Sequence, residues 1–556
     1  MQTVTDILCS SVASHGQTVA FQAYGPDGIE SPLTRGDVAA QAAALADVLH
    51  ARGIGPGRRV ALLADNCPQW PVAYFGVLLT GATLVPLDVK LIPGEIANIL
   101  SRSSAAAVLA CPGRSDKARA AAEGLCDVLP IPGTPEAPAP DEGALGRVLK
   151  RHTPRRDDLA VISFTSGTTG RPKGVMLTHA NIASNVAAGP KVMDFRPGDN
   201  FLSVLPLNHL FEQTLGMVLP FHGGAKVTYL QSLNPRILLE AMHRTETTVA
   251  VIVPAVARLF HKRALAAIDR LPPLKRALTR GLVRVAAAAG RCGIPVGPVL
   301  LRRLRKAFGA RMRVLFSGGA ALDDEVAWFF KHIGLPIMQG YGLSETSPLI
   351  SVNSPRHHRI GSVGRPIDKV AVRIDPLGGC DDGTGEILVR GPNVMAGYFE
   401  DDQATAAVLA DGWLRTGDIG RLDRDGYLYI TGRCKDVIIS ESGKNVYPNE
   451  IEAEIARRPE VGEVCVVALE TSKTGRRREE IVAVVTAAPD ATGDSDPASR
   501  REGVRQAIRA ACGRLADYKH PGYVVLWEGD LPRTATLKVR KRDLVERITR
   551  DMLVAL

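Results

Sequence analysis

Short apolar runs alternate with longer stretches of helical periodicity over about the first two thirds of the chain. The runs are rich in β-branched residues and fall at 59–63, 159–164, 201–205 and 249–253. A strand covered by helices on both faces reads as a continuous apolar run, so this alternation predicts an α/β fold with buried, largely parallel strands. From Val370 onward closely spaced strands with glycine turns, as at 385–389 and 426–430, indicate an antiparallel, β-rich part.

A second change of pattern follows Gly432, where a compact α+β series begins. It predicts strands at 437–440, 464–469, 481–487 and 523–527, and helices at 449–457 and 496–515. We therefore expect a large N-terminal domain at 1–432, made of layered α/β subdomains plus the β-rich subdomain, and a small α+β C-terminal domain at 433–556. The Pro- and Gly-rich stretch 130–140 is expected to be a loop.

Positive charge is concentrated in one region. The chain carries 68 Lys and Arg against 58 Asp and Glu, but residues 258–313 contain fifteen basic residues and a single acid, Asp269. A local excess of this kind argues against a nucleic-acid protein that is basic throughout and favours a polyanion or an anionic membrane surface as partner of that region. Within it, residues 300–308 have one apolar and one basic face. That pattern is typical of an interfacial helix and equally of a helix packed on the core with a solvated basic face.

The cysteines and the N-terminal sequence indicate the cellular compartment in which the protein is expected. The nine cysteines are scattered and include no C-x-x-C pair, so neither a disulfide framework nor a zinc site is indicated. No basic, apolar leader opens the chain, and no uncharged apolar run approaches the ~20 residues of a membrane helix. We expect a cytoplasmic protein that is at most peripheral to the inner face of a membrane.

The sharpest local signal is the segment 164–174, directly after a predicted buried strand. Its glycines allow close backbone approach to an anion, its hydroxyls donate hydrogen bonds, and its lysine adds a point charge. A Walker A loop needs Gly directly before Lys, whereas Pro172 stands before Lys173 here, so the P-loop interpretation fails. The residues expected to hold phosphate are Thr165, Ser166, Gly167, Thr168, Thr169, Gly170 and Lys173.

Five motifs in order resemble the adenylate-forming superfamily, which includes acyl-CoA synthetases, luciferases and peptide-synthetase adenylation domains. They are TSGTTGRPKG at 165–174, YGLSET at 341–346, TGD at 416–418, GRCKD at 432–436 and PRTATLK at 532–538. The resemblance covers essentially the whole chain. It implies a mobile C-terminal domain and a reaction in which a carboxylate attacks the α-phosphorus of ATP while pyrophosphate leaves.

The resemblance implies a role for each motif in binding nucleotide. The loop 165–174 would hold the β- and γ-phosphates, and Glu345 would bind the Mg²⁺ that bridges them. Ser344 stands where the family usually has Thr, and its hydroxyl can still donate to the α-phosphate. The adenine would lie against Tyr341, Gly342 and Gly319, Asp418 would accept hydrogen bonds from the ribose, and Arg433 would reach the ribose or phosphate side. Taken alone, Tyr-Gly-x-Ser-Glu and Gly-Asp strings are typical of turns.

The resemblance also implies residues for catalysis. Lys538 would bridge the carboxylate and α-phosphate during adenylation, with Lys173 and His209 beside the reacting groups. Lys435 matches the hinge about which the small domain turns, so that Lys538 leaves and Gly443 lines the passage for coenzyme A. Many members have Gly before the C-terminal lysine, whereas this chain has Leu537. Like the segments 205–214 and 440–452, the Thr-Leu-Lys form is similar to the long-chain branch.

The sequence therefore predicts an ATP-dependent fatty acid–CoA ligase, a long-chain one by resemblance, with ATP, Mg²⁺ and coenzyme A as cofactor and co-substrates. Two alternatives stay open. One is a fatty-acyl-AMP ligase that hands its adenylate to an acyl-carrier protein; the lack of an obvious insertion between Gly340 and Arg433 favours coenzyme A instead. The other is an inactive, lipid-binding scaffold, against which the intact Lys173, Glu345, Asp418 and Lys538 argue.

Overall fold

The protein was analysed as a computed structural model. It describes residues 2–133, 143–165, 172–232, 234–291, 294, 296–376, 383–439, 445–473, 476–488, 497–533 and 539–556. The chain divides into two compact units. The first comprises residues 1–372 and 389–414, and the second comprises 373–388 and 415–556.

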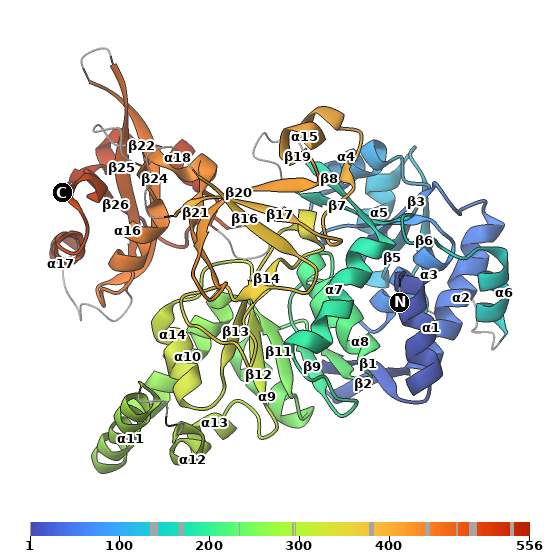
Figure 1. The fold of residues 1–556 in the computed structure, drawn as a ribbon, viewed down its shortest axis with the longest axis horizontal. Helices are drawn as coiled ribbons and strands as arrows, with labels where there is room; N and C mark the ends of the chain where they lie inside the picture. The colour runs from blue at the N-terminus through green and yellow to red at the C-terminus, as the bar shows by residue number, and fades with distance from the viewer. Residues whose placement is uncertain are drawn as a thin grey trace. The chain divides into compact units, whose positions relative to one another are not determined.

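A seven-stranded sheet forms one layer of the first unit, with strand order β18-β8-β7-β4-β3-β5-β6. Its central strands are parallel, and β8 and β18 close one edge in antiparallel pairing. Figure 1 shows α1, α2, α3 and α6 together at one side of this unit. The strands are β3 Arg59–Leu63, β4 Thr83–Pro86, β5 Ala107–Ala110, β6 Asp127–Pro130, β7 Leu159–Thr165, β8 Lys173–Thr178 and β18 Gly397–Tyr398.

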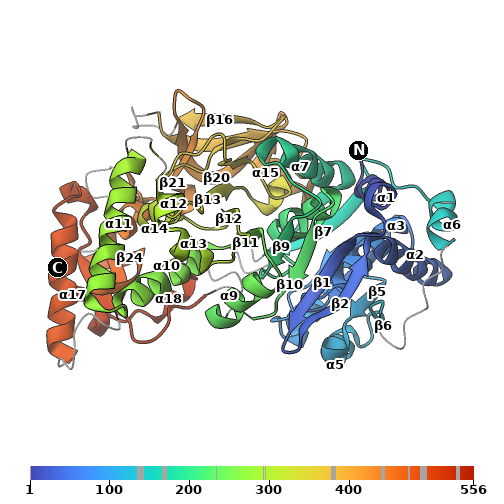
Figure 2. The ribbon, with the colours of Figure 1, turned by 90° about the horizontal axis from the view of Figure 1, so that it is seen from below.

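A nine-stranded sheet forms the second layer, in the order β15-β14-β13-β12-β11-β9-β10-β1-β2. The strands from β13 to β1 run parallel, and Figure 2 shows them following one another across the unit. Their carboxyl ends therefore meet at one edge of the sheet. The strands are β1 Val19–Gly25, β2 Gly28–Thr34, β9 Asn200–Ser203, β10 Lys226–Tyr229, β11 Val249–Ile252, β12 Val314–Ser317, β13 Ile337–Tyr341, β14 Ser351–Val352 and β15 Arg365–Pro366.

Helices connect the strands of both sheets. Several begin with a capping box; in α7, for example, Thr178 and Asn181 exchange side-chain and backbone hydrogen bonds. The α-helices of this unit are α1 Val4–His15, α2 Arg35–Ala51, α3 Gln69–Leu79, α4 Pro93–Ser103, α5 Ser115–Ala122, α6 Ala144–Arg151, α7 His179–Val192, α8 Leu219–His222, α9 Pro235–Arg244, α10 Pro254–Asp269, α11 Pro273–Arg291, α12 Gly297–Leu300, α13 Arg302–Lys306, α14 Asp324–His332 and α15 Asp402–Val408. Short turns of other helix types are η1 Pro112–Arg114, the π-helix η2 Glu212–Val218 and η3 Ser344–Thr346.

The second unit contains antiparallel strands followed by an α+β region. In the first part β20 pairs with β17, β21 and β19, and β16 lies beyond β17; the second part has a sheet in the order β24-β25-β26-β27 with apolar clusters packed against it. The strands are β16 Ala371–Pro376, β17 Gly385–Arg390, β20 Trp413–Leu422, β21 Leu428–Arg433, β22 Ile438–Ile439, β23 Asn445–Val446, β24 Val461–Lys473, β25 Arg476–Ala487, β26 Tyr523–Leu526 and β27 Val554–Ala555. The short strand β19 Leu409–Ala410, which pairs with the first residues of β20, belongs to the first unit. The helices are η4 Cys434–Asp436, α16 Pro448–Ile455, α17 Pro497–Cys512, η5 Asp517–Lys519, α18 Lys541–Arg547 and η6 Arg550–Met552.

The predicted α/β class is confirmed, as are the buried strands of the first part of the chain and the elements of the C-terminal series. The runs 464–469 and 481–487 extend into a longer hairpin, because β24 and β25 continue pairing to Lys473 and Arg476. The compact second unit begins at 415 and includes 373–388. The predicted domain boundary between residues 432 and 433 marks the hinge of a mobile C-terminal domain, and it stays a prediction. Most of the predicted loop at 130–140 lies outside the described residues.

The basic region 258–313 folds into α10 to α13. Of its predicted apolar face, Leu301 and Phe308 are buried, and the ring of Phe308 contacts those of Phe260 and Phe330. Residues 302–306 form only a short helix, on which Arg302 and Arg303 are exposed. For this segment the core-packed alternative is therefore the better description. No helix among the residues described here is long and apolar enough to cross a membrane.

Candidate active site

The predicted phosphate-binding segment lies between two paired strands of the first unit. β7 ends at Thr165 and β8 begins at Lys173, and these two residues are antiparallel partners. The Thr165 hydroxyl donates a hydrogen bond to the Lys173 carbonyl oxygen at 3.5 Å. Five of the predicted phosphate-binding residues, Ser166, Gly167, Thr168, Thr169 and Gly170, lie outside the described part of the chain.

Lys173 and Glu345 are joined through an aromatic residue that the sequence analysis missed, Tyr398. The Lys173 Nζ lies 4.7 Å from the centroid of the Tyr398 ring, and the Tyr398 hydroxyl donates to Glu345 Oε1 at 2.9 Å. Burial, and next the charge of Glu345, raise the pKa of Tyr398 above its usual value, so this hydroxyl remains protonated. Three residues far apart in the sequence thus form one contiguous polar cluster.

Glu345 is held in place by the loop on which it lies. The loop follows β13, and Gly342 allows its tight path, because a Cβ at that position would lie 1.9 Å from the Pro348 carbonyl oxygen. Thr346 directly follows Glu345, and its carbonyl oxygen accepts hydrogen bonds from the side-chain amides of Asn185 at 2.9 Å and Asn393 at 3.3 Å. These buried amides fix the backbone beside the carboxylate.

A single carboxylate suits the magnesium role that the resemblance implies for Glu345. Mg²⁺ in nucleotide sites is usually held by one or two protein carboxylates, with phosphate oxygens and waters completing the octahedron. Within the described residues there is no group of three His, Cys, Asp or Glu side chains that could hold a metal by themselves. The donor set therefore fits an ion that arrives with a triphosphate.

The predicted residues His209, Gly319 and Tyr341 follow parallel strands of the nine-stranded sheet. β9 ends at Ser203, β12 ends at Ser317 and β13 ends at Tyr341, so His209 and Gly319 come after strand carboxyl ends and Tyr341 is itself such an end, all at the same edge. His209 is half-buried and its backbone begins the turn that leads into η2. Gly319 has φ +84°, a conformation that favours glycine.

Ser344 begins η3 in the first unit, and the remaining predicted nucleotide residues belong to the second unit. Asp418 on β20 and Arg433 on β21 are register partners, and Arg433 Nε lies 3.0 Å from Asp418 Oδ1. Asp418 is deeply buried, and its amide donates to the Thr416 hydroxyl oxygen at 3.1 Å. Lys435 follows on η4, where burial and then the charge of Arg433 lower its pKa. Gly443 and Lys538 lie outside the described residues.

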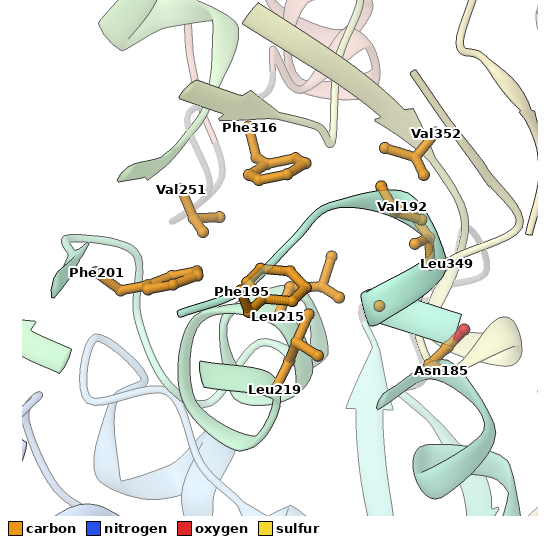
Figure 3. Close-up of a pocket in the computed structure, with 11 residues that line it drawn as sticks. Asn185, Val192, Phe195, Phe201, Leu215, Leu219, Val251, Phe316, Leu349 and Val352 are labelled. Atoms are coloured by element: carbon orange, nitrogen blue, oxygen red, sulfur yellow. The ribbon is translucent and has the colours of Figure 1, made fainter. Parts of the chain in front are cut away.

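An apolar cavity lies in the first unit between the nine-stranded sheet and the helices α7, η2 and α8. It encloses about 410 Å³ of empty space, including its open mouth. Figure 3 shows Phe316 and Val251 on one side, across from Phe195, Leu215 and Leu219. The residues that line it are Asn185, Gly189, Val192, Phe195, Phe201, Leu215, Leu219, Val251, Phe316, Leu349 and Val352.

Asn185 connects this cavity to the Glu345 loop. It is the one polar side chain among the lining residues, and its amide nitrogen donates to the carbonyl of Thr346, the neighbour of Glu345. Leu349 and Val352, farther along the same segment, also line the cavity. The cavity and the Glu345 loop therefore share Asn185.

Comparison with known proteins agrees with these motifs. The family of AMP-binding enzymes matches residues 10–399, and the AMP-binding enzyme C-terminal domain matches 450–538. The chain belongs to this adenylate-forming family, and it is an acid–thiol ligase. Ligases of this class act on an acid, ATP and coenzyme A.

Individual relatives differ in the acid that they use. The chain is 32% identical to the long-chain-fatty-acid–CoA ligase FadD15 of Mycobacterium bovis, covering 84% of this chain and 79% of the relative. It is 30% identical to the indoleacetate–CoA ligase of Aromatoleum aromaticum, covering 94% of each. The crystal structure of ATP-bound MatB from Rhodopseudomonas palustris is 26% identical, with a TM-score of 0.76 and 98% coverage of both chains. The family is thus established and the acid is not.

Proposed function

We propose that this ligase activates a fatty acid, preferably a long-chain one, as an acyl-adenylate and transfers the acyl group to coenzyme A. The observation that carries the proposal is the apolar cavity that reaches the Glu345 loop through Asn185. Burying a hydrocarbon chain in such a cavity contributes about 0.8 kcal/mol per methylene group. The carboxylate would then be held at the polar end, where the nucleotide reacts.

In this proposal the residues of the site bind the reacting anions and neutralise their charge. Lys173 and the segment 165–170 neutralise and orient the leaving pyrophosphate, and Tyr398 keeps the Glu345 carboxylate aligned for Mg²⁺. Tyr341, Gly342, Gly319, Ser344, Asp418 and Arg433 bind the adenosine and α-phosphate, and His209 lies toward the acyl group. Lys538 stabilises the negative charge that develops as the carboxylate attacks, and Lys435 and Gly443 serve the second half-reaction. Mg²⁺, when bound, supplies further neutralisation of the phosphates.

A pyrophosphate-release screen tests the proposed substrate. Acids from acetate through long saturated chains to benzoate and indoleacetate are compared with and without coenzyme A. We expect kcat/KM to rise with chain length, and we expect Val251→Phe, which narrows the cavity, to lower it at least tenfold for long chains but little for acetate.

Other outcomes of this screen would favour the alternatives. Strong AMP formation with no use of coenzyme A would favour transfer to an acyl-carrier protein. A preference for aromatic over aliphatic acids would contradict the long-chain proposal, and no pyrophosphate with any acid would favour a scaffold.

We further propose that helix α11 brings the enzyme to anionic membranes, where fatty acids partition. Leu274, Leu278 and Val285 are spaced along one helix face and are 83%, 64% and 54% exposed. The helix contacts the rest of the unit through a different face, where Ala286 is buried. Figure 1 shows α11 projecting beyond α10.

The charges of α11 favour a lipid surface over a second copy of the chain. Lys275 and Arg284 flank the exposed apolar face, whereas Arg276 and Arg280 lie toward the opposite side of the helix, where Arg280 pairs with Asp269. No acid occurs within 273–291. Two copies meeting through this face would oppose like charges, whereas anionic lipid would attract them by about 1 kcal/mol per basic residue.

Liposome co-sedimentation tests this surface. We expect the double variant Leu274→Glu, Leu278→Glu to reduce partition onto anionic vesicles at least tenfold, because it removes the inserted apolar groups and adds repulsion. The double variant Arg302→Glu, Arg303→Glu on α13 is the matched control: it makes a larger change in net charge outside the apolar face and should have the smaller effect. Equal sedimentation of wild type and the leucine variant would refute the proposal.

A further inference from the structure

A buried carboxylate supports the turn that carries Asp418 in the second unit. Glu386 lies on β17, the neighbour of β20 in the sheet, and its side chain is buried. Its Oε1 accepts a hydrogen bond from the backbone amide of Gly417 at 3.1 Å, and its Oε2 pairs with the guanidinium of Arg415. One side chain thus holds two residues of the segment that leads to Asp418.

The backbone of this turn depends on such support. Gly417 has φ +71° within β20, and glycine leaves a conformation more freely than any other residue. The hydroxyl of Thr416 donates to the carbonyl oxygen of Ile387 at 2.8 Å and accepts from the Asp418 amide at 3.1 Å. Two consecutive residues of β17, Glu386 and Ile387, therefore hold the turn.

The direction of the Asp418 carboxylate depends on the same turn. Asp418 directly follows Gly417 and is buried, and its Oδ1 lies 3.0 Å from Nε of Arg433. A change in the peptide between residues 417 and 418 would redirect the carboxylate. Hydrogen bonds weaken steeply when they are misaligned, so a small shift of this backbone is enough to lose a bond to a ligand.

We propose that Glu386 is a positioning residue for Asp418. By holding the Gly417 amide, it sets the direction in which Asp418 accepts hydrogen bonds from the ribose, and thereby the preference of the enzyme for ribonucleotides over deoxyribonucleotides. The inference rests on the proposed function, in which Asp418 binds the ribose. Glu386 acts only through the turn, and Arg415 balances its buried charge.

Calorimetric titration with AMP, 2′-deoxy-AMP and 3′-deoxy-AMP tests this role without any acid substrate. We expect wild type to bind AMP about tenfold more tightly than the analogue that lacks the bound hydroxyl, because a hydrogen bond to a charged group is worth at least about that factor. In Glu386→Ala this ratio should fall to about two or less, mainly through weaker binding of AMP. A merely structural role of Glu386 would weaken all three nucleotides alike and leave the ratio unchanged.

Two variants serve as matched controls. Glu386→Gln keeps an acceptor for the Gly417 amide and should retain most of the ratio. Asp375→Asn removes the other carboxylate that pairs with Arg415, at 3.3 Å and at an exposed position, and should bind all three nucleotides as wild type does. If Glu386→Ala does not fold, Glu386→Asp takes its place, because its carboxylate is one methylene group too short for the Gly417 amide.

Asp418→Ala separates this inference from the proposed function. If Asp418→Ala loses the ratio while the Glu386 variants keep it, the ribose role of Asp418 stands and the inference is overturned. If Asp418→Ala keeps the wild-type ratio, the ribose role in the proposed function fails, and the inference fails with it. Loss of the ratio in both Asp418→Ala and Glu386→Ala, with retention in Glu386→Gln, supports the inference.

Discussion

Replacing Lys538 with alanine is expected to lower the rate of acyl-adenylate formation by on the order of 10²- to 10³-fold, the usual effect of removing one group that stabilises transition-state charge. Two anions approach each other in this step, and Lys538 is the residue proposed to bridge them. Pyrophosphate release with the best acid of the screen measures the effect.

The second half-reaction supplies an internal control for this variant. Because Lys538 is proposed to leave the site before thioester formation, the variant should still convert supplied acyl-adenylate and coenzyme A to acyl-CoA at near the wild-type rate. Arg542→Ala removes an exposed positive charge on α18 that pairs with Glu546, and it should change neither step. An unchanged rate of adenylation in the Lys538 variant would refute the assignment.

Replacing Glu212 with glutamine is expected to stabilise the protein at alkaline pH. Glu212 is fully buried on η2, and burial raises the pKa of its carboxyl to about 8, whereas the unfolded chain loses this proton near the usual 4.5. Between these values the unfolded state binds fewer protons, so the free energy of unfolding falls as pH rises and levels off above pH 8. At about 1.4 kcal/mol per pKa unit, this fall amounts to at most about 4 to 5 kcal/mol.

Denaturant unfolding from pH 4.5 to 9 measures this difference. The variant should match the wild type near pH 4.5 and exceed it increasingly toward pH 8, because glutamine carries no proton to lose. Tyr229, the titratable group that faces Glu212, stays protonated over this range, because burial holds its pKa well above the usual value. Glu123→Gln, at an exposed position, is the control and should follow the wild type. Parallel curves for wild type and Glu212→Gln would show that the carboxyl is ionised or hydrated in the folded protein.

Much of the architecture could be predicted because it depends on local patterns. The runs at 59–63, 159–164 and 249–253 form strands, since an apolar, β-branched run between helices has few other ways to be buried. Lys173 and Glu345 were found for a related reason, because each belongs to a motif whose residues are adjacent in sequence.

Residues that act through long-range pairing could not be predicted in this way. Tyr398 reaches Lys173 and Glu345 only because β18 pairs with β8, and its two-residue strand carries no local signal. Glu212 lies within a segment noted for its similarity to long-chain ligases, yet nothing in that segment reveals a buried and unpartnered carboxyl. Burial depends on what packs against a residue, and the sequence pattern does not contain that information.

The basic region 258–313 shows most clearly which properties follow from the sequence and which from tertiary packing. The sequence by itself determined that 258–313 is strongly cationic and that residues 300–308 have an apolar and a basic face, because charge and periodicity are properties of the chain. Only the tertiary structure decided which apolar residues are covered: Leu301 and Phe308 are buried, whereas Leu274 and Leu278 remain exposed on α11. Periodicity identifies an apolar face, but packing against other elements decides whether that face contacts protein or is left open to solvent.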